Sequence, residues 1–253
     1  MIRRCVVAAA VGLLLFTHSA VPPQAYAREP ADVSILLIGS SLVRGVKASA
    51  KRLFKSIDVK AKIKGSGRAR WSLVDHANSP RTDKIIHQRP WDIVLLANSS
   101  VGISTTDYDD AIALYEKIIL TGASVGFLMT WLEEDKPFSS YDALKGTPGG
   151  MFGYVPIAVQ LDVPIAPAGW GVRNAIKDSV ESGVPFDLWK KAQHLNRNGN
   201  YLAGAIVFTT LTQVSPVGLW APGRFTPEET AYLQTLAADT VLSDLSEWNI
   251  TPN

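Results

Sequence analysis

The chain has 253 residues, a single cysteine and a formal charge of +2. Arg3 and Arg4 account for that charge, because residues 28–253 carry 23 basic and 23 acidic side chains. A neutral chain argues against nucleic acid or an anionic membrane surface as the main partner. Cys5 is the only cysteine, so disulfides, zinc–thiolate sites and thiol catalysis are excluded from residues 28–253.

The first 27 residues combine two arginines, an apolar run over 6–16 and the small-residue sequence Ala25-Tyr26-Ala27. This order predicts a secretory signal peptide cleaved after Ala27, with an uncleaved anchor as the alternative. Cys5 precedes the apolar run, whereas a lipoprotein cysteine follows it. We expect an exported protein, periplasmic or extracellular, without stable membrane insertion, in which residues 28–253 form one domain.

Short apolar runs alternate with amphipathic stretches, which predicts a parallel sheet with helices on both faces. The expected strands are Val33–Ile38, Val59–Ile63, Ile93–Ala97, Ser124–Met129 and Val163–Ala166. The expected helices are Leu42–Lys55, Tyr108–Leu120, Asn198–Leu211 and Thr226–Leu245, the last with a Thr-Pro-Glu-Glu start. Glu133–Tyr154 is expected to be a long surface loop, and the last five residues a frayed tail.

A buried strand runs into Gly39-Ser40-Ser41-Leu42 and then into a helix pattern. Such a junction lies at the carboxyl end of the sheet, where α/β proteins bind ligands. It places Ser41 near a helix N-terminus, where backbone N–H groups can hold an oxyanion. Ser41 is therefore a candidate nucleophile, and the alternative is that Ser40 or Ser41 merely caps the helix.

His194-Leu195-Asn196 precedes the third expected helix on a segment rich in turn residues. A serine nucleophile needs a neighbouring base at neutral pH, and histidine has a suitable pKa. His194 is the candidate base, with His76 as the second choice. The alternative is a structural or surface histidine.

Together these features resemble the SGNH, or GDSL-type, family of esterases and acetylhydrolases. That family carries Gly-Asp-Ser-Leu after its first strand and Asp-x-x-His near its C-terminus. Gly39-Ser40-Ser41-Leu42 and His194 occupy those places here. Trp91–Leu96 and Ala166–Trp170 resemble a bacterial SGNH-like subgroup, so the resemblance spans about residues 33–220.

The resemblance implies an α/β fold: a three-layer α/β/α sandwich with a mainly parallel, flavodoxin-like five-stranded sheet. It also implies Ser41 as nucleophile, His194 as base, and no metal or organic cofactor. The family's triad aspartate is replaced by Lys191, which cannot accept the imidazole N–H. Asp187, a backbone carbonyl or Gln193 is the group that would orient His194 instead.

The resemblance implies an oxyanion hole made by the Ser41 N–H, a second-block glycine N–H and an Asn side chain, for which Gly67 and Asn98 are the candidates. Ser40 and Arg70 are further candidate substrate-binding residues. The family's second-block glycines align near Ala69 and Arg70, and Gly67 is the preferred donor because glycine lets a substrate approach the backbone. Asn98, after the third strand, has a turn-stabilising role as its alternative. Arg68 and Arg70 either hold an anionic sugar or carboxylate or are solvated.

We expect a secreted ester hydrolase acting on a small-molecule or glycan ester, such as an O-acetyl carbohydrate, and not on nucleic acid. Trp71, Trp131, Trp170 and Trp189 are candidate sugar platforms or core residues. One alternative, motivated by Lys191, is a non-catalytic binding protein. Another is a glycan O-acyltransferase with the same Ser41 intermediate. Fold alone does not separate these functions.

Overall fold

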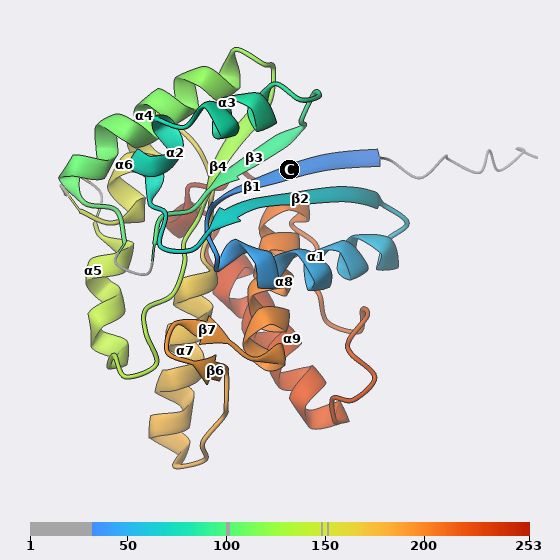
Figure 1. The fold of residues 1–253 in the computed structure, drawn as a ribbon. Coiled ribbons are helices and arrows are strands. Elements are labelled where there is room, and N and C mark those ends of the chain that lie inside the picture. The colour runs from blue at the N-terminus through green and yellow to red at the C-terminus, as the bar shows by residue number, and fades with distance from the viewer. Residues whose placement is uncertain (1–31, 100–101, 148, 151) are drawn as a thin grey trace, which may run out of the picture.

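The computed structural model describes residues 32–99, 102–147, 149–150 and 152–253 (Figure 1). The predicted signal peptide, residues 1–27, lies outside them. Within the described ranges, no helix is both long and apolar enough to cross a membrane.

Five parallel strands form the central sheet in the order β2-β1-β3-β4-β5. The strands are β1 (Asp32–Ser40), β2 (Lys60–Arg68), β3 (Ile93–Leu96), β4 (Ser124–Leu128) and β5 (Ile165–Ala166). All five overlap the expected strands. The inner strands β1, β3 and β4 read as continuous apolar segments because both of their faces are buried, whereas the edge strand β2 alternates exposed lysines with buried Ala61 and Ile63. Strand addition reverses direction between β1 and β3, and that switch point is the usual ligand site of such sheets.

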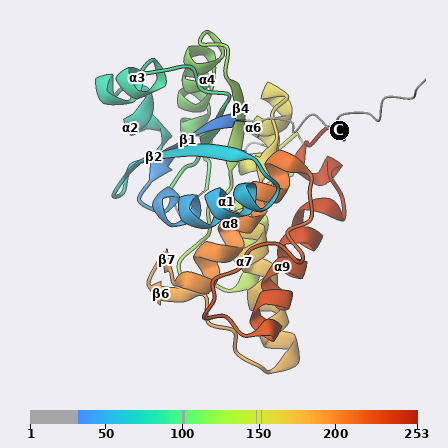
Figure 2. The ribbon, with the colours of Figure 1, turned by 90° about the vertical axis from the view of Figure 1, so that its right-hand side faces the viewer.

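Helices cover both faces of the sheet, so the predicted three-layer α/β/α sandwich is confirmed (Figures 1 and 2). One face carries α1 (Val43–Ser56) and α8 (Arg197–Thr212), with α7 (Ala168–Ser182) and α9 (Pro227–Leu242) packed on α8. The other face carries α2 (Leu73–Ala77), α3 (Pro80–Ile86), α4 (Thr105–Ile119) and α6 (Tyr154–Leu161). The remaining elements are η1 (Phe138–Ser140), α5 (Tyr141–Lys145), the antiparallel pair β6 (Trp189–Lys191) and β7 (His194–Leu195), and η2 (Ser246–Trp248).

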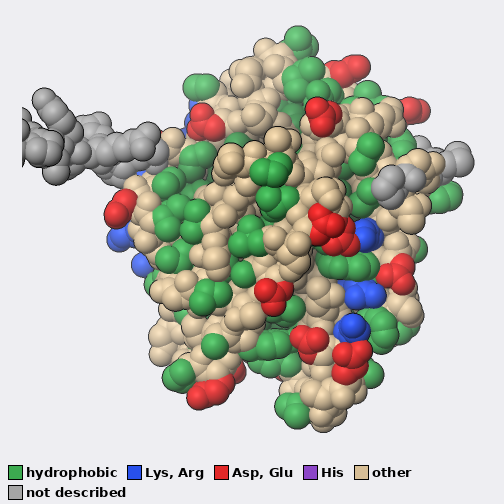
Figure 3. All heavy atoms as spheres, turned by 180° about the vertical axis from the view of Figure 1, so that it is seen from behind, with side chains coloured by type: hydrophobic (Ala, Val, Ile, Leu, Met, Phe, Trp, Pro, Cys, Tyr) green, Lys and Arg blue, Asp and Glu red, His purple; other side chains and the backbone are tan. Residues whose placement is uncertain are grey.

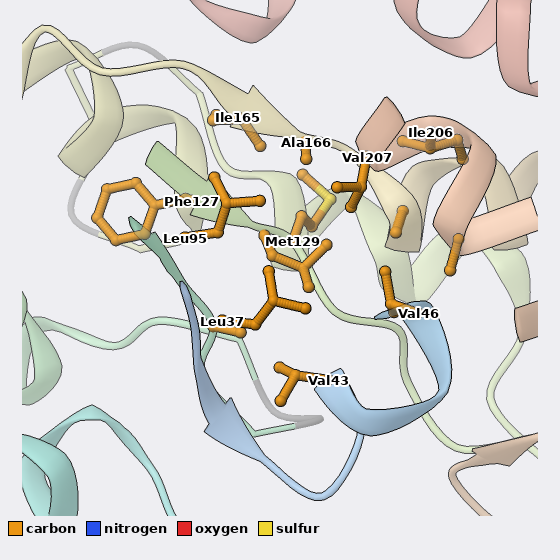
Figure 4. Packing of buried hydrophobic residues seen from close by; sticks show 14 of the residues in the cluster. Leu37, Val43, Val46, Leu95, Phe127, Met129, Ile165, Ala166, Ile206 and Val207 are labelled. Atoms are coloured by element: carbon orange, nitrogen blue, oxygen red, sulfur yellow. The ribbon is translucent and has the colours of Figure 1, made fainter. Parts of the chain in front are cut away.

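Hydrophobic side chains fill the space between the sheet and helices α1 and α8 (Figure 4). Leu37 and Leu95 project from the sheet toward Val46 of α1 and Val207 of α8, and all four are at most 1% exposed. Each such side chain contributes roughly 1.5–3 kcal/mol by leaving water. This core fixes α1 and α8 against the sheet.

Helices α1 and α8 approach closely through glycine. A Cβ on Gly45 would overlap the Asn200 side chain, and one on Gly204 would lie 2.6 Å from the Ser49 Cβ. Gly45 lies against Asn200, and Ser49, four residues later in α1, lies against Gly204, four residues later in α8. The two helices therefore run parallel. The turn before α1 and the segment before α8 therefore lie at the same end of the molecule.

The segment Glu133–Tyr154 is not the continuous loop that its Gly, Pro and charged residues predict. It contains η1 and α5, and Tyr141 of α5 is fully buried. The Tyr141 hydroxyl accepts a 3.2 Å hydrogen bond from the Leu132 N–H. Burial of Tyr141 and Leu144 anchors this segment to the core, which local composition does not reveal.

The predicted frayed C-terminus is also wrong. Asn249 donates from Nδ2 to the Val163 carbonyl at 3.0 Å, and Ile250 is only 6% exposed. The Gln213 amide donates to the Thr251 carbonyl at 2.8 Å. Contacts with residues far away in the sequence hold this tail in place.

Candidate functional site

Ser41 lies in the turn between β1 and α1, at the switch point of the sheet. Its neighbour Ser40 is 4% exposed, and the Ser40 Oγ accepts a 3.3 Å hydrogen bond from the Leu42 N–H. Helix α1 has no side-chain cap and no acidic residue in its first turn. Ser41 is half-buried, and its hydroxyl has no hydrogen-bond partner in the described part of the chain. Thus Ser40 holds the turn, whereas the Ser41 hydroxyl is available beside unsatisfied helix N–H groups.

His76 fixes the end of β1 from behind. Its Nε2 lies 2.9 Å from the Gly39 carbonyl oxygen and its Nδ1 lies 2.9 Å from the Thr82 Oγ1. A carbonyl only accepts, so Nε2 carries the proton and Nδ1 accepts from Thr82. Burial lowers the pKa of His76, although the hydrogen bond to Gly39 opposes the shift. With both nitrogens engaged in the core, His76 is a positioning residue for the turn and a poor candidate for the base.

Asn98 lies at the carboxyl end of β3, across the switch point from the Ser41 turn. It is 1% exposed, its Oδ1 accepts from the Leu73 N–H at 3.1 Å, and its Nδ2 donates to the Gly102 carbonyl. The amide nitrogen has two N–H groups, and the bond to Gly102 uses one. Asn98 thus joins β3 to the start of α2 and retains one donor.

Tyr154 and Thr130 hold the backbone of Asn98 in place. The Tyr154 hydroxyl accepts a 3.1 Å hydrogen bond from the Asn98 N–H, and the Thr130 hydroxyl donates to the Ser99 carbonyl at 3.1 Å. Both side chains are fully buried, and burial raises the pKa of the Tyr154 hydroxyl. Neither residue was predicted from the sequence, because Tyr154 falls at the end of the segment expected to be a loop.

Gly67 lies inside β2, opposite Gly39, because the strand extends to Arg68 rather than ending at Ile63. A Cβ on Gly67 would overlap the Ser40 carbonyl oxygen, and the Gly67 carbonyl accepts a 2.8 Å hydrogen bond from the Arg44 Nη2. Glycine is needed here for close packing under the turn. Its role as an oxyanion donor stays a prediction.

Arg70 is exposed in the loop after β2 and has a φ of +64°. Glycine adopts this left-handed conformation without the steric cost that a Cβ brings. The conformation agrees with the alignment of the family's second-block glycines near Ala69 and Arg70. The structure gives the Arg70 side chain no contact with Ser41, so its role in substrate binding stays a prediction.

His194 lies on the short hairpin formed by β6 and β7, where it pairs in register with Lys191. The Trp131 Nε1 donates a 2.7 Å hydrogen bond to the Gln193 carbonyl, next to His194. Trp131 is 1% exposed and follows β4, so this bond ties the hairpin to the carboxyl edge of the sheet. The parallel packing of α1 and α8 brings the hairpin to the Ser41 end of the molecule, and the His194 ring is exposed there.

Asp187 shapes the chain ahead of α8. Its Oδ1 accepts from the Trp189 N–H at 2.9 Å, and its carbonyl accepts from the Asn196 and Asn198 amides at 3.0 and 3.2 Å. Asn196 in turn caps α8. In the described residues, no hydrogen bond connects Ser41, His194 and Asp187 with one another.

The four candidate sugar-stacking tryptophans differ in accessibility. Trp131 is buried, and guanidinium groups lie 4.6 Å over Trp71 and 4.1 Å over Trp170, from Arg68 and Arg173 respectively. Trp189 is half-buried on β6, near His194. The part of the chain that the structure describes contains no group of three or more His, Cys, Asp or Glu side chains that could hold a metal ion.

No family model matches the sequence, and no curated protein sequence matches it either. Among solved structures, a DUF4886 family protein from Bacteroides uniformis ATCC 8492 is similar, with a TM-score of 0.67 and 17% sequence identity. That match covers 83% of this chain and 95% of the other. The acetyl xylan esterase AlAXEase is similar with a TM-score of 0.50 and 11% identity, over 71% of this chain and 100% of the other. The chain therefore shares its α/β/α fold with these two proteins, in agreement with the expected fold class.

Proposed function

We propose that this protein is an exported serine ester hydrolase that removes a small acyl group, such as O-acetyl, from a carbohydrate. The observation that carries the proposal is the half-buried Ser41 hydroxyl, which has no hydrogen-bond partner among the described residues and lies beside the uncapped N-terminus of α1 at the switch point. Shared fold with an acetyl xylan esterase supports the reaction class. Export rests on the signal-like sequence of residues 1–27.

In the proposed reaction, the Ser41 Oγ attacks the ester carbonyl carbon while the His194 imidazole takes the hydroxyl proton. The oxyanion of the tetrahedral intermediate accepts hydrogen bonds from N–H groups at the start of α1, assisted by Asn98 and Gly67. Collapse breaks the bond to the alkoxy oxygen, which leaves as an alcohol with the proton from His194. Water, deprotonated by His194, then attacks the acyl-serine, releasing the carboxylic acid and free Ser41.

The proposal requires His194 to approach Ser41 in the substrate complex. The imidazole is exposed on a two-residue strand and has no hydrogen-bond partner among the described residues, so rotation of its side chain breaks no contact. Catalytic hydrogen bonds often form only in that complex. The hydrogen bond from Trp131 to Gln193 ties the hairpin to the carboxyl edge of the sheet and supports this approach.

Two kinds of acceptor are available to orient His194 in the proposed mechanism. The Asp187 Oδ1 already accepts the Trp189 N–H, which leaves Oδ2 for the imidazole if the loop turns inward. A backbone carbonyl of the hairpin serves equally well as an acceptor for the imidazole N–H. An unchanged rate for Asp187→Ala would remove the carboxylate from the mechanism.

Turnover of p-nitrophenyl acetate by purified residues 28–253 tests the proposal. Ser41→Ala and His194→Asn should each lower kcat by at least about 10³-fold, because nucleophile and base act as a unit. His87→Asn, at an exposed histidine on the opposite face of the sheet, should retain wild-type turnover. Turnover that survives Ser41→Ala would contradict the assignment.

A binding protein without catalysis is the second candidate. Lys191 favours it, because this cation pairs in register with His194 where the family has the triad acid. A neighbouring cation opposes the imidazolium that the reaction forms. Binding of acetylated oligosaccharide without measurable release of acetate would support this candidate over the hydrolase.

A further inference from the structure

Basic side chains concentrate on one edge of the sheet. Helix α1 carries Arg or Lys at five positions and strand β2 at four, and neither element contains an acidic residue. On the face seen from behind in Figure 3, acidic side chains are the more frequent charged groups. The net charge of residues 28–253 is zero, but basic and acidic side chains lie on different parts of the surface.

Five basic side chains, three of them from α1 and β2, line one hollow, which we call the basic hollow. It has a volume of about 480 Å³, and among the described residues that line it there is no Asp or Glu. Its basic residues are Arg44, Lys64, Arg68, Arg81 and Lys84. They come from the edge strand β2 and from α1 and α3, which lie on opposite sides of it (Figure 2).

The cations of the basic hollow are not neutralised by neighbouring acids. None of the five forms an ion pair within the described ranges. The Arg44 guanidinium donates to the Gly67 carbonyl, and the Lys64 Nζ donates to the Gln88 Oε1 at 2.5 Å. The nearby Asp83 is already paired with Lys117 at 3.0 Å.

Protection of an exposed strand edge does not account for this cluster. Lysines commonly blunt edge strands, and this explains Lys62 and Lys64 of β2. Arg81 and Lys84 lie on α3, where no strand edge needs protection, yet they face the same hollow. Five like charges around one cavity repel one another, and an anionic ligand would relieve that repulsion.

The basic hollow adjoins the candidate nucleophile. Arg68 is paired in register with Ser40, and neighbouring strands lie about 4.8 Å apart. Arg44 lies in the first turn of α1, three residues after Ser41. A ligand bound in the basic hollow would therefore lie next to the turn that contains Ser41.

We propose that the basic hollow binds the carboxylate groups of an acidic oligosaccharide whose acyl ester is presented to Ser41. The position of the ester rests on the proposed function, whereas binding of the acidic sugar does not. Lys64 and Gln88 also line a second hollow of about 340 Å³ with Lys51 and Arg89. Two contiguous basic hollows fit several acidic sugar units rather than one.

The aromatic residues of this surface favour a glycan over nucleic acid. Single-stranded nucleic acid binds by stacking its bases on open aromatic faces. The two tryptophans here are covered, because Arg68 lies 4.6 Å over Trp71 and Arg89 lies 4.1 Å over Trp91. The basic surface thus offers charge without stacking platforms.

Isothermal titration calorimetry of residues 28–253 at low salt tests the proposal with defined probes. Hexagalacturonate should bind at least tenfold more tightly than galacturonate, and neutral maltohexaose should not bind. The double substitution Arg81→Glu/Lys84→Glu should weaken hexagalacturonate binding at least tenfold. Arg224→Glu, at an exposed arginine outside the hollow, is the matched control and should leave binding unchanged.

Equal binding of hexagalacturonate by wild type and the Arg81→Glu/Lys84→Glu variant, with both folded by circular dichroism, would overturn the proposal. Tighter binding of a thymidine dodecanucleotide would overturn it in favour of nucleic acid. Binding of hexagalacturonate without hydrolysis of p-nitrophenyl acetate would contradict the proposed function alone. Hydrolysis without binding would contradict this inference alone.

Discussion

Acidification below pH 6.5 should destabilise the folded protein through His76. This histidine is fully buried, and burial lowers its pKa below the ordinary value of 6.5. Below pH 6.5, His76 therefore binds a proton more readily in the unfolded chain than in the folded chain. Stability from the neutral ring is fully present above pH 6.5 and falls as the pH drops below it.

The structure sets the size of this effect. While His76 stays neutral in the folded state, each pH unit below 6.5 costs at most about 1.4 kcal/mol. Lowering the pH from 7.5 to 5.5 should then remove at most about 1.4 kcal/mol, which corresponds to at most about 5 °C of Tm for a domain of this size. His76→Asn should abolish that pH dependence while lowering stability at pH 7.5 by about 2–4 kcal/mol, because it breaks a buried hydrogen bond and the 4.9 Å ring contact with Trp71.

Urea unfolding at pH 7.5, 6.5 and 5.5 measures both effects. Carboxylates that titrate in this range contribute equally to wild type and variant, so the difference in slope isolates His76. His87→Asn, at an exposed histidine, should keep the wild-type slope. The same pH dependence in wild type and His76→Asn would refute the argument that His76 is buried and neutral.

Three further substitutions test the packing around the site. Trp131→Phe removes the hydrogen bond to Gln193 and should cost about 1–3 kcal/mol in urea unfolding while also lowering esterase kcat, whereas an unchanged kcat would remove its positioning role. Gly45→Ala should cost about 1–3 kcal/mol, because its methyl group overlaps Asn200; a Tm equal to wild type would show that the two helices separate easily. Arg70→Gly should raise stability by about 0.5–1 kcal/mol by relieving the positive φ, and a lower Tm would contradict the steric argument.

Elements with a strong local pattern were predictable from the sequence. The inner strands β1, β3 and β4 contain continuous apolar runs. Helix α9 begins with the expected capping box, in which the Thr226 Oγ1 accepts from the Glu229 N–H at 3.1 Å. Helix α7 was not predictable, because glycines stand in its first turn. Gly169 is required there by a tertiary contact, since a Cβ would overlap the Thr130 carbonyl oxygen. Local propensity contains no information about such a contact.

The candidate site was predictable to the same limited degree. The strand-to-helix junction identified Ser40 and Ser41 together, but only the hydrogen bond from Leu42 shows that Ser40 is engaged. The link from Trp131 to Gln193 joins residues 62 positions apart, and no short-range pattern signals it. The five-cation hollow likewise depends on three elements that meet only in the folded chain.

Covalent labelling of Ser41 tests the central claim most directly. Folded residues 28–253 would be treated with a fluorophosphonate, which reacts with activated serine, and the labelled residue located by mass spectrometry. The account predicts a label on Ser41 that is lost in urea and strongly reduced in His194→Asn. A folded protein that shows no label on Ser41, or a label that persists undiminished in His194→Asn, would contradict it.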